Sequence, residues 1–100
     1  MASIRRLVLD VLKPVEVPTV SFAQELSDLD GVDAAVVRLV ETDREVQNVV
    51  LVVEGENVDF ERVEESIESL GGTLHSVDEV ACGAFVPERD GSSTDATWLR

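Results

Sequence analysis

The sequence predicts a two-layer α/β (α+β) sandwich, in which two helices cover one face of a four-stranded antiparallel sheet. Its 100 residues, enough for one domain, include only three Phe, one Trp and no Tyr. Val, Leu and Ile must therefore build the core, and β-branched side chains favour strands. Four Val-rich segments alternate with two segments of helical periodicity, in the order strand, helix, strand, strand, helix, strand.

The boundaries of these elements follow from turn signals. The predicted strands span residues 4–13, 32–42, 46–54 and 73–81, and the predicted helices span residues 19–30 and 60–70. Pro14 ends the first strand. Gly31 and Gly71 follow the two helices as C-terminal caps, and Asp59 is an N-cap for the second. This βαββαβ order is that of the ferredoxin-like fold. Residues 1–87 are predicted to form the domain and residues 88–100 a flexible tail.

Each predicted helix has one apolar stripe that would face the sheet. The stripes consist of Phe22, Leu26 and Leu29 in the first helix, and of Phe60, Val63, Ile67 and Leu70 in the second. The opposite side of the second helix carries several Glu residues. It is best explained as a solvated surface.

The side chains of a strand alternate between the two faces of its sheet. The odd-numbered positions of the four strands are almost all apolar, so we expect them to face the helices. The even-numbered positions are also rich in apolar residues: Ile4, Val8, Leu12, Val32, Ala34, Val36, Val40, Val46, Val50, Val52 and Leu74. Without helices over it, this second face would be a larger apolar patch than monomers usually expose. We therefore expect a homo-oligomer.

Polar residues are mixed into the same even-numbered set. They are Arg6, Asp10, Arg38, Asn48, Ser76 and Asp78. Charges removed from water need partners. For Arg6 and Asp10 we expect partners from Ser76 or Asp78, from Arg38, or from another subunit. The six residues are interpreted as interface groups that set the register between subunits. The alternative is an anion or ligand site built on Arg6 and Arg38.

The charge of the chain restricts its partners and its environment. There are 21 acidic and 8 basic residues, for a net charge of −13. Such a surface repels phosphate backbones and anionic membranes, so neither nucleic acid nor membrane is expected as a partner. A surplus of acids with a single Lys favours a halophilic cytoplasm, where salt screens the repulsion. A mesophilic acidic protein is the alternative.

No residue pattern predicts catalysis or a bound cofactor. Cys82 is the only Cys, and His75, its only conceivable base, is seven residues away near the same strand. Two acidic groups could hold a hard cation, although neither has EF-hand spacing. They are Glu54, Glu56 and Asp59 in one predicted loop, and Asp30 and Asp33 around Gly31. Solvated loops explain both groups more simply, and we expect neither a metal nor an enzyme.

Three segments resemble a known family. They are Ser3-Ile4-Arg5-Arg6-Leu7-Val8-Leu9-Asp10-Val11-Leu12-Lys13-Pro14, Leu29-Asp30-Gly31-Val32-Asp33, and Gly71-Gly72 followed by His75-Ser76-Val77-Asp78-Glu79-Val80-Ala81. In residues 3–83 the chain is similar to the archaeal domain-of-unknown-function family 211. The resemblance implies a ferredoxin-like sandwich that assembles into homo-oligomers, with a ring as the expected form, and no established activity. Together with the acidity it implies a haloarchaeal member.

Two functional hypotheses follow. The first is a non-enzymatic, oligomeric binding or scaffold protein, because the sheet is apolar on both faces and no catalytic constellation is present. The second is a regulatory domain that senses a small molecule or divalent cation at a subunit interface, by analogy with other domains of this fold. An enzyme that uses a site shared at the subunit interface is a third, less favoured alternative.

Overall fold

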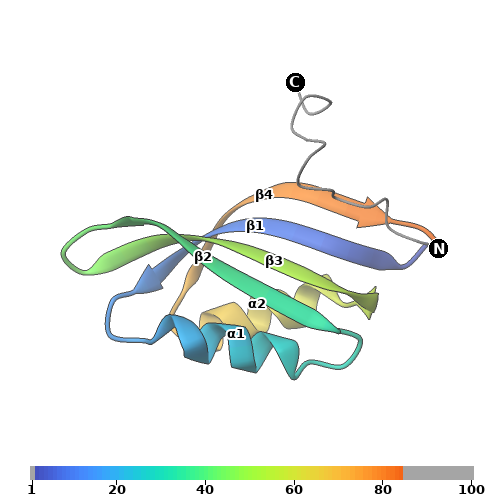
Figure 1. Ribbon diagram of the computed structural model, residues 1–100, viewed down its shortest axis with the longest axis horizontal. Helices are drawn as coiled ribbons and strands as arrows, with labels where there is room; N and C mark the ends of the chain where they lie inside the picture. The colour runs from blue at the N-terminus through green and yellow to red at the C-terminus, as the bar shows by residue number, and fades with distance from the viewer. Residues whose placement is uncertain (1, 85–100) are drawn as a thin grey trace.

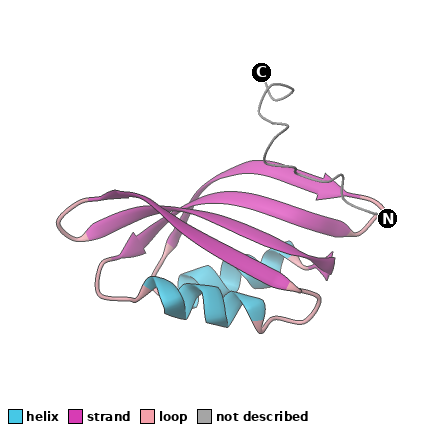
Figure 2. Cartoon of the chain, in the orientation of Figure 1, coloured by secondary structure: helices cyan, strands magenta, loops and turns pink. Residues whose placement is uncertain are grey.

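The computed structural model describes residues 2–84, which form two layers (Figure 1). The elements are β1 (Ile4–Pro14), α1 (Thr19–Ser27), β2 (Ala34–Thr42), β3 (Val46–Val58), α2 (Phe60–Ser69) and β4 (Thr73–Cys82). Both helices lie on the same face of the twisted sheet (Figure 2). The tail predicted at residues 88–100 lies outside the described residues. Neither helix of residues 2–84 is long and apolar enough to cross a membrane.

The sheet has the strand order β2-β3-β1-β4, and every neighbouring pair is antiparallel. β1 and β3 therefore occupy the centre, and β2 and β4 are the two edges. This topology confirms the predicted ferredoxin-like fold. It also means that β2 runs parallel to β1 and that the two edge strands, β2 and β4, run antiparallel to each other.

The core lies between the two central strands and the helices. It contains Leu7, Leu9, Val11, Phe22, Leu26, Val49, Leu51, Val53, Val58, Val63 and Ile67. All the odd-numbered core positions predicted for β1 and β3 are among these residues. The apolar stripes of both helices also meet the sheet as expected, since Leu29, Phe60 and Leu70 pack against this cluster.

The two helices end differently. α2 begins at Asp59, whose carboxylate accepts hydrogen bonds from the backbone N–H groups of Glu61 and Arg62, as predicted for an N-cap. It ends at Ser69, followed by Leu70 at the C-cap and then by Gly71, which has the left-handed φ of +86° that glycine adopts without strain. α1 has Pro18 at its N-cap and no side-chain cap. It ends at Ser27, three residues earlier than predicted, so Gly31 is a loop residue and not its cap.

β-Bulges correct part of the predicted face assignment. Ile4, Val32 and Leu74 were assigned to the face without helices, but all three pack against the core. Register shifts lie beside Ile4 in β1 and between the β4 residues Leu74 and Ser76. A bulge inserts an unpaired residue, so strict alternation fails on either side of it. Val32 precedes β2, which begins at Ala34 rather than at residue 32.

Glycines allow the α1–β2 loop to pack closely against the end of β3. β3 continues to Val58 through Gly55, Glu56 and Asn57, which were predicted as a loop. A Cβ on Gly55 would lie 1.9 Å from the carbonyl oxygen of Gly31, and a Cβ on Gly31 would lie 2.1 Å from that of Asn57. Only glycine permits this approach, which joins the α1–β2 connection to the end of β3.

Candidate functional site

The candidate site is the face of the sheet opposite the helices, which we call the open face, together with the strands at its edges. Its side chains form rows across the four strands, because the strands are in antiparallel register. One row consists of Arg38 on β2, Val50 on β3, Asp10 on β1 and Ser76 on β4. Neighbouring strands are about 4.8 Å apart, so two strands separate Arg38 from Asp10 by roughly 10 Å. Arg38 and Asp10 are therefore not a direct pair.

The other predicted site residues lie in different rows or at a bulge. Asn48 is in the next row, between Glu41 and Leu12. Asp78 has no partner in the β1–β4 register, because the bulge between Val77 and Glu79 leaves it out. Its carboxylate accepts a hydrogen bond of 2.8 Å from the Ser76 hydroxyl. The structure thus places Asp10, Arg38 and Ser76 in one row and joins Asp78 to Ser76, whereas Arg6 and Asn48 lie in other rows.

Arg6 is the most buried charge on this face. Its Nε donates to Glu54 of β3 at 2.7 Å, and its Nη1 donates to Glu79 of β4 at 3.0 Å. Its side chain is 7% exposed, whereas the two glutamates remain partly exposed. One guanidinium therefore ties both neighbouring strands to β1. The partners predicted for Arg6 were wrong, since both are glutamates that the prediction did not consider.

The pKa of Arg6 follows from this environment. Burial acts to lower the pKa of the guanidinium, because it disfavours the charged form. The hydrogen bonds and charges of Glu54 and Glu79 outweigh that effect and raise the pKa above its ordinary value. Arg6 is permanently charged and already neutralised. It is consequently a strand-joining group and a poor candidate for an anion site.

Sequence reasoning could have found one of the two glutamates. Glu54 has the same even-numbered parity as Arg6 and lies on the strand that a βαββαβ order places beside β1. It was instead grouped with Glu56 and Asp59 as a loop. Glu79 is odd-numbered, and only the β4 bulge moves it to the open face. No pattern in the sequence predicts that bulge.

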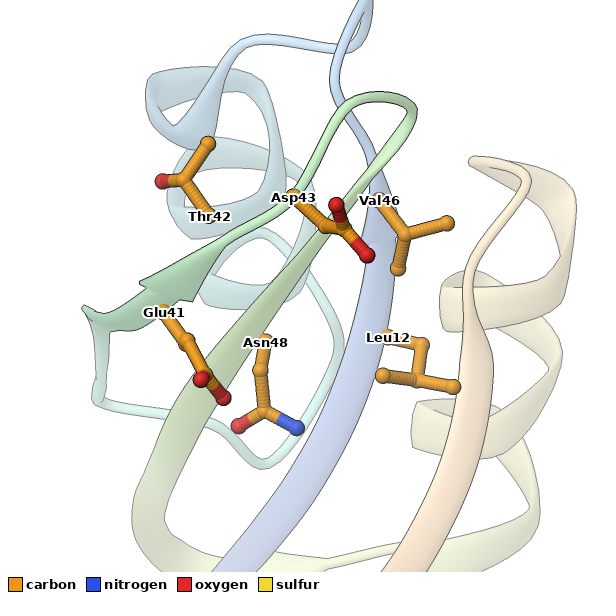
Figure 3. Close-up of a pocket in the computed structure, with 6 residues that line it drawn as sticks. All are labelled: Leu12, Glu41, Thr42, Asp43, Val46 and Asn48. Atoms are coloured by element: carbon orange, nitrogen blue, oxygen red, sulfur yellow. The ribbon is translucent and has the colours of Figure 1, made fainter.

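A hollow of about 420 Å³ lies at one end of the open face. It is lined by Leu12, Glu41, Thr42, Asp43, Val46 and Asn48. Figure 3 shows the Glu41 carboxylate next to the Asn48 amide. The side chains of Leu12 and Val46 lie on the opposite side of the hollow. The hollow thus combines an apolar wall with oxygen-rich groups from the β2–β3 hairpin. Its volume and mixed lining suit a small polar molecule.

The acidic loops do not form a recognisable metal centre. Within residues 2–84, no group of three or more His, Cys, Asp or Glu side chains is arranged to hold a metal ion. Glu54 is engaged by Arg6, and Asp59 caps α2. Cys82 is exposed at the end of β4.

Exposed apolar side chains gather on the edge strands. Within residues 2–84, eight large apolar residues are 40–63% exposed, and five of them lie on β2 and β4: Val36, Leu39, Val40, Val77 and Val80. The centre of the open face differs, because Val8, Val50 and Val52 are half-buried among their neighbours. Apolar exposure is therefore concentrated at the edges, whereas the sequence predicted it over the whole face.

Lys13 is the other buried charge. It is 1% exposed, and its ammonium donates to the backbone carbonyls of Pro14, at 2.8 Å, and Val17. Burial lowers the pKa of Lys13, and the nearby Glu16 carboxylate opposes that change. The side chain holds the β1–α1 turn closed. Sequence analysis did not single it out, because a lone Lys at a strand end ordinarily points to solvent.

Comparison with known proteins places this arrangement in a family. The family described as DUF211, uncharacterized ArCR, matches residues 5–96. The chain belongs to the DUF211 family. It is also 46% identical to the uncharacterized protein MJ0319 of the archaeon Methanocaldococcus jannaschii. That similarity extends over 88 residues, which are 88% of this chain and 91% of the relative. The predicted family resemblance is thereby confirmed, and this DUF211 chain has nearly the same length as its relative.

Proposed function

We propose that this DUF211 chain is a non-enzymatic binding or scaffold protein that acts as a homo-oligomer. One observation carries the proposal: on a chain of net charge −13, five large apolar side chains are exposed on the two edge strands. Exposed apolar patches on soluble proteins mark interaction surfaces. Unpaired strand edges are sites of association unless they are protected.

The same chemistry argues against an enzyme. In the charge cluster of Arg6 with Glu54 and Glu79, the guanidinium is paired with both carboxylates and joins strands. His75 and Cys82 are exposed near the ends of one edge strand. Neither has a neighbouring group, within residues 2–84, that would activate it as a nucleophile or base.

The hollow at Glu41, Asp43 and Asn48 favours a second candidate function. A small polar molecule could bind there and be sensed, and the hollow lies beside exposed residues of the β2–β3 hairpin that a second subunit could cover. A divalent cation is the less favoured ligand, because only two carboxylates line this hollow. In this function the oligomer would complete the site.

We further propose a halophilic, cytoplasmic setting, supported by the acid surplus and the single Lys. Each added subunit brings another −13 charges, so assembly must overcome repulsion that salt screens over about 10 Å at 0.1 M and 3 Å at 1 M. Assembly should consequently weaken as salt falls from molar to about 0.1 M.

Sedimentation equilibrium in molar KCl tests the first function. The expected result is a mass that is a multiple of the 10.9 kDa chain, and a monomer at micromolar concentration would contradict it. A thermal-shift screen of metabolites and divalent cations tests the second function. A ligand present at 100 times its Kd adds about 2.7 kcal/mol to the stability. Asn48→Ala should remove that shift, and Ser76→Ala, outside the hollow, is the control.

A further inference from the structure

We propose that copies of this chain associate edge to edge, with β2 of one copy pairing antiparallel to β4 of the next in a continuous sheet. The inference rests on the proposed self-association and names its surface. It differs from the sequence-based expectation that another copy covers the open face.

The direction of the strands supports this pairing. β2 and β4 are the two edges of the sheet and run antiparallel to each other. Two copies in the same orientation, side by side, would therefore extend the antiparallel ladder from β4 to β2. The edges also match in length, with nine residues in β2 and ten in β4. Every copy would offer one edge of each kind, so the contact is head to tail.

One register of this pairing brings exposed apolar side chains of the two edges into contact. Leu39, Val77 and Val80 lie on the helix side of the sheet, because they pair with Val49, Leu9 and Leu7 of the core rows. Placing Leu39 opposite Val77 brings two exposed apolar side chains together on that side. The bulge at Asp78 then places Val37 opposite Val80, also on the helix side. This register covers Leu39, Val77 and Val80 on the helix side, whereas Val36, on the open face, and Val40, at the β2 register shift, lie outside these pairs.

The charges of the two edges are complementary in the same register. Arg38 lies on the open face of β2, and no acidic side chain within residues 2–84 forms an ion pair with it. It would face Glu79 and the exposed Asp78 of the next copy. Pairing of two β4 edges would instead oppose acids to acids, whereas pairing of two β2 edges could set Arg38 against Glu41 of the other copy, because both lie on the open face. Head-to-tail pairing sets Arg38 against two acids and also covers Val77 and Val80, which pairing of two β2 edges would leave exposed.

Two blocked-edge variants test the proposal. Arg38→Glu with Leu39→Glu blocks the β2 edge, and Val77→Glu with Val80→Glu blocks the β4 edge. Val20→Glu, which places the same charge on an exposed residue of α1, is the matched control. All five positions are exposed, so circular dichroism and thermal melting should show folded chains. Sedimentation equilibrium in molar KCl then gives the mass of each protein and of mixtures.

The expected result is that the control assembles like the wild type, whereas each blocked variant sediments as a single chain. An equal mixture of the two blocked variants should form a species of two chains. The unblocked β4 edge of one variant can then pair with the unblocked β2 edge of the other. If both blocked variants assemble like the wild type, the edges are not the contact and the inference is overturned. If one blocked variant is monomeric and the other is a dimer by itself, like edges pair and the inference is again overturned. A monomeric wild type would overturn the proposed function as well.

Discussion

β2 and β3 are neighbours in one hairpin and have similar Val-rich sequences, but their apolar side chains differ in burial. Val49, Leu51 and Val53 of β3 are completely buried, whereas no residue of β2 is buried. β3 has a strand on each side and helices over it. β2 has one neighbouring strand and extends beyond the cover of the helices (Figure 1). Position in the sheet therefore decides burial here, and composition does not.

The largest expected effect compares two leucines on the same side of these two strands. Leu51→Ala should lower the free energy of unfolding by about 3–4 kcal/mol, because it removes buried contacts and leaves a cavity. Leu39→Ala should change the stability of the chain by less than about 0.5 kcal/mol, since Leu39 is half exposed. Urea denaturation of both variants in dilute solution, where single chains are compared, measures the difference. Equal losses would mean that β2 is as well covered as β3.

The second prediction concerns the end of β3. Gly55→Ala should lower the free energy of unfolding by about 1–3 kcal/mol, because its Cβ would collide with the carbonyl oxygen of Gly31 at 1.9 Å. Glu56→Ala, at the exposed next position, is the control and should have little effect. The same denaturation assay applies. A neutral Gly55→Ala would show that the two loops can separate without cost.

The third prediction compares a charge on a central strand with one on an edge strand. Arg6→Ala should destabilise the chain by about 2 kcal/mol, because it removes two charge-assisted hydrogen bonds and leaves Glu54 and Glu79 facing each other across β1. Arg38→Ala should leave the stability of the chain nearly unchanged. Thermal melting of both variants in dilute solution, where single chains are compared, measures the two effects. Equal effects would mean that Arg6 contributes no more to stability than a surface charge does.

The smallest effect is a pH dependence from Lys13. Its pKa in the folded chain lies below its ordinary value of 10.5, so the unfolded chain binds more protons in the pH range between the two values. Stability should therefore rise slightly as pH increases through that alkaline range. The chain has no Tyr and no other Lys. Denaturation at several alkaline pH values measures the slope, and Lys13→Met should abolish it. A slope that persists in Lys13→Met would assign it to another group.

Much of the fold was predictable because short-range patterns carry it. The stripe of Phe22 and Leu26 and the alternation of Val49, Leu51 and Val53 each reflect one element facing one core, so periodicity alone locates them. The Asp59 cap and the Gly71 helix end are likewise local. The candidate site was less predictable, because its geometry depends on contacts between distant residues. Arg6 meets Glu54 and Glu79 at separations of 48 and 73 residues.

By itself, the sequence determined the βαββαβ order, the core positions of the central strands, the acidic surface and the family. These depend on periodicity, on composition, or on residues adjacent in the chain. The tertiary structure decided which charges pair and where apolar side chains stay exposed. One bulge in β4 moves Glu79 to the open face and leaves Asp78 out of register, and the limited width of two helices leaves Val77 and Val80 uncovered. Bulges and layer width depend on how strands and helices pack together, so no local pattern encodes them.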